Sequence, residues 1–82
     1  MTNPMIAQLK ITLAECKNEK KELELKIKRN FAEIQANINP YFTDSRQIKA
    51  AEIEQAADEL LESKNKLAQV EQRIAELQEE LG

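Results

Sequence analysis

The stretch IEQAADELLESKNKLAQVEQRIAELQEEL, residues 53–81, decides the fold. A branched apolar residue stands at every seventh position of it: Ile53, Leu60, Leu67, Ile74 and Leu81. Small or apolar residues stand three positions after each of the first four: Ala56, Ser63, Val70 and Leu77. Alternating gaps of three and four place all of these side chains on one stripe of a helix, and four successive heptads are typical of a coiled coil.

A second helix is indicated in the first half of the chain. Its apolar residues also recur at gaps that fit one helix face: Ile6, Leu9, Leu13, Cys16, Leu23, Ile27 and Ile34. Asn3 can cap this helix and Pro4 suits its first position, whereas Pro40 disfavours helical geometry at Asn39. Asp44 and Gln47 have the spacing of a capping box that opens the following helix.

The expected structure is therefore one all-α domain over residues 1–82, an antiparallel two-helix hairpin of the coiled-coil type. Its helices are expected at about 4–38 and about 45–81, with a turn at about 39–44, and Gly82 is placed as a C-cap. We call the stripe along which the two helices face each other the seam.

Matching the apolar residues across the seam gives a predicted register. It pairs Ile6 with Leu77, Leu9 with Ile74, Leu13 with Val70, Cys16 with Leu67, Leu23 with Leu60, and Ile27 with Ala56. The same register brings together three pairs of opposite charge: Lys26 with Glu59, Glu19 with Lys66, and Lys10 with Glu71.

Polar residues interrupt the seam of the first helix. The predicted register sets Lys20 opposite Ser63, either as a lysine whose ammonium reaches water or as a residue that fixes register. Asn30 is expected at the boundary of the seam, because the seam is expected to have drifted to Phe31 at that point. Phe31 and Ile38 are expected beside the seam near the turn.

Composition and charge exclude several functional classes. The chain has no apolar run long enough to span a membrane, and its single cysteine, Cys16, excludes an internal disulfide and favours the cytoplasm. Residues 1–39 carry seven basic and five acidic side chains (+2), and residues 40–82 carry five and ten (−5). Acidic residues interrupt the basic segment 17–29, so a nucleic-acid partner is disfavoured.

Catalytic chemistry has few candidate residues in this sequence. Without histidine, no histidine-based acid–base pair, triad or zinc site can form within one chain. The single glycine, Gly82, excludes a glycine-rich phosphate loop. We expect no enzymatic activity, cofactor or metal.

Two of the three aromatic residues, Tyr41 and Phe42, stand side by side in the expected turn. They either plug the end of the hairpin or form a tip that binds a partner, and the sequence leaves both interpretations open.

Further apolar residues lie off the seam at heptad spacing, which usually marks association. This expected self-association face consists of Ile11, Leu25, Ile48, Leu61, Ala68 and Ala75. Two hairpins joined there would form a four-helix bundle. The favoured function is a small protein–protein interaction module whose partner is a second copy (homodimer) or another helical protein. The alternatives are an accessory chaperone or adaptor that holds a client at Tyr41 and Phe42, and a nucleic-acid-contacting arm that uses residues 17–29.

Overall fold

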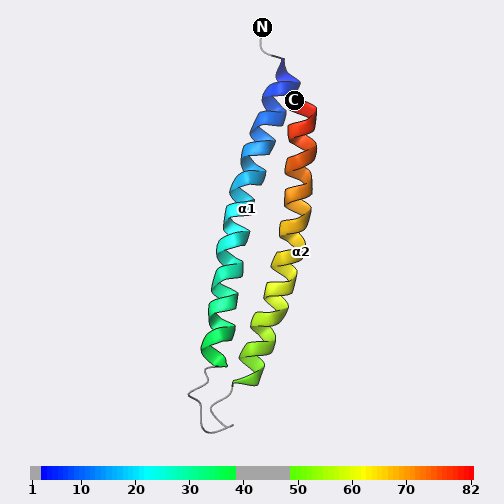
Figure 1. Cartoon of the computed structure of the whole chain (residues 1–82). Helices are drawn as coiled ribbons and strands as arrows, with labels where there is room; N and C mark the ends of the chain where they lie inside the picture. Colours follow the sequence, from blue (N-terminus) through cyan, green and yellow to red (C-terminus); the bar gives the residue numbers. More distant parts are fainter. Residues whose placement is uncertain (1–2, 39–48) are drawn as a thin grey trace.

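The computed structural model describes residues 3–38 and 49–82, which form two long helices packed side by side (Figure 1). Helix α1 spans Pro4–Asn37 and helix α2 spans Ala50–Leu81. They run in opposite directions and contact each other along most of their length. The predicted all-α antiparallel hairpin is confirmed.

Asn3 and Gly82 cap their helix ends as predicted, whereas α2 begins at Ala50 after Lys49, whose side chain makes no capping hydrogen bond. The side-chain oxygen of Asn3 accepts a hydrogen bond from the backbone N–H of Met5 at 2.9 Å, and Pro4 is the first residue of α1. The backbone N–H of Gly82 donates to the carbonyl oxygen of Gln78 at 2.8 Å. The expected turn and the Asp44–Gln47 capping box lie outside the described residues.

The core is a single narrow strip between the helices. Its buried apolar side chains are Leu23, Ala56, Val70, Ile74 and Leu77. Leu13, Cys16 and Leu67 pack against this strip and are partly buried. The buried residues of α2 follow the predicted spacing of three and four residues, so the repeat in residues 53–81 does form the contact face.

The register differs from the prediction by about one heptad. The Nζ atom of Lys20 lies 3.9 Å from a carboxylate oxygen of Glu71, although the predicted register places Lys20 opposite Ser63. The predicted partner of Ile6 is likewise wrong: α1 extends beyond the last turn of α2, and Ile6 is 43% exposed (Figure 1). A shift by a whole heptad keeps every apolar residue on the seam, so the apolar pattern fits both registers.

The expected drift of the seam from Asn30 to Phe31 is also wrong. Asn30 is only 5% exposed and lies in the seam, whereas Phe31 is 53% exposed beside it. A straight helix would drift by about 20° per heptad relative to a strict seven-residue repeat. In this hairpin the least exposed residues of α1 keep the spacing of three and four as far as Asn37, so the contact face follows the repeat.

In the described part of the chain, neither helix combines the length and the apolar character that a membrane span requires.

Candidate interaction surfaces

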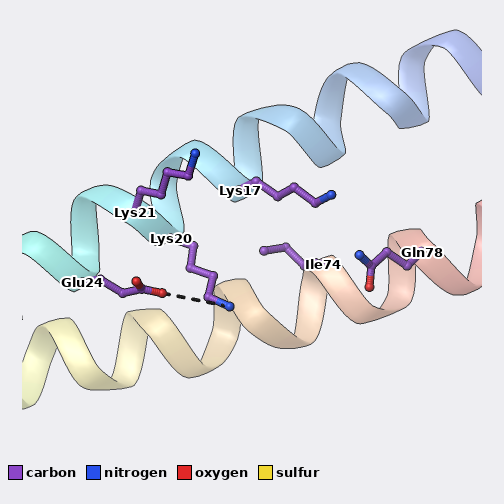
Figure 2. Close-up of a pocket in the computed structure, with 6 residues that line it drawn as sticks. All are labelled: Lys17, Lys20, Lys21, Glu24, Ile74 and Gln78. Carbon is purple, nitrogen blue, oxygen red and sulfur yellow. Dashed lines mark ion pairs between the residues drawn. The ribbon is translucent and has the colours of Figure 1, made fainter.

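A shallow groove of about 440 Å³ follows one side of the seam (Figure 2). We call it the lysine groove, and its walls are Lys17, Lys20, Lys21 and Glu24 from α1 and Ile74 and Gln78 from α2. The Nζ atom of Lys20 lies 4.0 Å from Glu24 and 3.9 Å from Glu71, and its side chain is 40% exposed. The stem of Lys20 therefore starts at the seam and its ammonium reaches carboxylates at the surface, which agrees with the first of the two interpretations of this residue.

A second groove of about 410 Å³ is lined by the buried Leu23 and by charged side chains. The charged residues around it come from both helices: Glu19, Glu22, Lys26, Arg29 and Lys66. Lys66 lies 3.0 Å from Glu62 one turn away, and its hydrogen bond and charge lower the pKa of the Glu62 carboxyl, with a smaller contribution from Lys26.

The basic segment 17–29 does not form one positive face. Lys17, Lys20 and Lys21 line the lysine groove, whereas Lys26 and Arg29 line the second groove among glutamates. A nucleic-acid surface gains affinity from basic side chains that displace counterions together along one track. The alternative of a nucleic-acid-contacting arm stays a prediction, and the arrangement of these residues does not favour it.

The outer side of α1 carries a separate shallow hollow of about 490 Å³. Its lining residues all belong to α1: Leu25, Lys28, Arg29 and Ala32. Leu25 is 59% exposed, and Ile11 on the same side of the helix is 52% exposed. These two members of the expected self-association face therefore lie away from α2.

The α2 members of the expected face lie on the lysine-groove side of the other helix and are turned away from the seam. Leu61 is 61% exposed, and Ala68 and Ala75 are exposed at the two following heptad positions. The structure thus distributes the described members over two surfaces of the hairpin and does not bring them together in one. Ile48 lies outside the described residues, as do Tyr41 and Phe42, so their roles stay predictions.

Sequence reasoning missed an exposed apolar surface near the turn end of the described helices. We call it the turn-end patch, and it consists of Phe31, Ile38, Ala57 and Leu61. Phe31 and Ile38 were expected beside the seam near the turn, and there they are 53% and 57% exposed. The helical spacing between the four patch residues and the polar residues of the lysine groove could have shown that they lie on the same side of the hairpin.

The described residues offer little for metal or thiol chemistry. Within residues 3–38 and 49–82, no three potential metal ligands among His, Cys, Asp and Glu gather at one point. Cys16 is half-buried and packs against the apolar core, which is the environment of a cysteine used for packing.

No protein-family model, curated protein or solved structure matches this chain.

Proposed function

We propose that this protein is a small, non-enzymatic protein–protein interaction module, a coiled-coil hairpin that self-associates into a homodimeric four-helix bundle. The observation that supports this most is the balance of apolar side chains. Five apolar residues are buried in the described part of the chain, whereas seven large ones stay exposed. A two-helix layer buries only one stripe of each helix, and a second copy can cover further apolar side chains.

The exposed area points in the same direction. A compact monomer of this mass is expected to expose about 5,000 Å². The chain exposes 6577 Å². The excess is larger than the roughly 800 Å² that each partner contributes to a standard interface. Two hairpins packed together can therefore remove the excess without any change of fold.

The cytoplasm is the proposed location. A single cysteine that is half-buried against the core and has no second cysteine to pair with fits a compartment that keeps thiols reduced.

Light scattering across a concentration series, from about 1 to 100 µM, tests self-association directly. We expect a mass near twice the 9.4 kDa of one chain, with the fraction of dimer rising with concentration. A monomeric mass over the whole range would overturn the proposal, and another helical protein would then be the partner to seek. Circular dichroism on the same samples checks that the hairpin is folded in every measurement.

A further inference from the structure

We infer that the turn-end patch is the contact between the two copies, and that the second hairpin docks on it in antiparallel orientation. The inference depends on the proposed self-association and adds its surface and its geometry.

The helical spacing places the four patch residues on one side of the hairpin. Phe31 follows Glu24 by seven residues, and Glu24 lines the lysine groove, so Phe31 lies on the same side of α1. Ile38 continues that line by another seven residues. On α2, Ala57 precedes Gln78 of the lysine groove by three heptads, and Leu61 lies one turn from Ala57.

The large exposed apolar side chains of this side lie in its turn-end half. Toward the chain termini the same side carries Lys17 and Glu24 on α1 and Glu71 and Gln78 on α2. The turn-end half joins Phe31, at 53% exposure, with Ile38 at 57% and Leu61 at 61%. An exposed apolar patch with a polar border is a mark of a protein interaction site, and aromatic residues are among those that contribute most binding energy.

The charges around the patch identify the occupant as a second copy. Lys28 and Lys64 border its terminal end, each three residues from a patch member, and Glu54 borders its turn end, three residues before Ala57. In an antiparallel dimer, a two-fold axis runs through the patch perpendicular to the helices. The basic end of each copy then lies against the acidic end of the other, so the same contact between opposite charges forms twice. A parallel arrangement would place like charges together.

In the described part of the chain, these charges form no ion pair with one another or with other residues. The ion pairs between described residues include Lys20, Lys49, Lys66 and Arg73, but none of them includes Lys28, Lys64 or Glu54.

The first test compares two substitutions that add the same charge at similar exposure. Phe31→Glu lies in the patch, and Leu25→Glu lies on the outer side of α1. We expect Phe31→Glu to raise the dimer Kd by about 100-fold and Leu25→Glu to change it by less than about 3-fold, as measured by light scattering. If Phe31→Glu lowers the helical content measured by circular dichroism, Leu61→Glu repeats the test from α2.

The second test concerns orientation. Glu54→Lys should weaken the dimer by about 10-fold, because each copy then sets a lysine against the partner's basic end. Adding Lys28→Glu and Lys64→Glu to the same chain should restore the parent affinity. Dissociation that the added substitutions do not reverse would overturn the antiparallel arrangement.

The outcomes separate this inference from the proposal on which it depends. A monomeric parent protein would refute self-association itself. A dimeric parent whose Phe31→Glu and Leu61→Glu variants stay dimeric would refute the turn-end patch and leave self-association standing.

Discussion

Replacing the buried amide of Asn30 by a leucine is expected to stabilise the hairpin. Asn30 is 5% exposed, and its Nδ2 atom finds no hydrogen-bond acceptor among the described residues. A buried polar group without a partner costs about 1–3 kcal/mol, and an apolar side chain of similar size removes that cost. Asn30→Leu should therefore raise the free energy of unfolding by about 1–3 kcal/mol. For a chain of this size, each kcal/mol corresponds to roughly 4–8 °C in the melting temperature.

Asn18→Leu on the same helix is the matched control. Asn18 is exposed, so this change gives only the difference in helix propensity, a few tenths of a kcal/mol. Urea unfolding followed by circular dichroism measures both variants, at one protein concentration, because association stabilises the folded state by mass action.

The gain at Asn30 must exceed the gain at Asn18 for the reasoning to hold. Equal gains would mean that helix propensity accounts for the effect. A loss at Asn30 would mean that the amide is satisfied in solution, and that its burial stabilises the seam.

Two further predictions concern the core and the surface. Leu77→Ala should lower the free energy of unfolding by about 2–5 kcal/mol in the same urea assay, because Leu77 is fully buried and its loss leaves a cavity; a change below about 0.5 kcal/mol would contradict its place in the core. The pKa of the Glu62 carboxyl should lie below 4.5 and should rise toward that value in Lys66→Met, as followed by NMR titration. Because the pKa of this carboxyl is lower in the folded than in the unfolded state, the pair stabilises the hairpin above the unfolded-state pKa. This stabilisation is lost as the pH falls through the folded-state pKa.

The hairpin itself could be predicted from the sequence because its determinants are local. The heptads of residues 53–81 specify a helix with one apolar stripe whatever lies opposite. Asn3 and Pro4 specify the beginning of α1 through a hydrogen bond to Met5, two residues away. A cap or a stripe involves residues within one or two turns, so it can be recognised before the tertiary structure is known.

The register could not be predicted in the same way, because the apolar layers repeat every heptad. The expected helix boundaries at 38 and 45 centre the hairpin on Tyr41 and Phe42. The described helices end at Asn37 and begin at Ala50, which moves the centre toward α2. A few residues at one boundary are enough to change which heptads face each other, and boundaries are the least certain part of a sequence-based assignment.

The turn-end patch escaped prediction for a related reason. Phe31 and Ile38 are at positions that can either fill the seam or flank it, and the choice depends on whether the contact face drifts along α1. Because the buried residues keep the strict repeat, both side chains flank the seam and stay more than half exposed.

The polar residues in the seam affect the stability of the hairpin in the observed register. The predicted register pairs the two polar seam residues Lys20 and Ser63 and maximises apolar overlap by covering Ile6. The observed register gives up the cover on Ile6, brings Lys20 near Glu71, and leaves the Nδ2 atom of Asn30 without an acceptor among the described residues. The exposed ion pair contributes only about 0–1 kcal/mol, which is less than the cost expected for a buried unpaired amide. Side-chain pairing around Lys20 therefore does not select this register. Asn30→Leu should accordingly stabilise the hairpin without moving Lys20 from Glu71, and a loss of the Lys20–Glu71 proximity in that variant would show that Asn30 fixes the register.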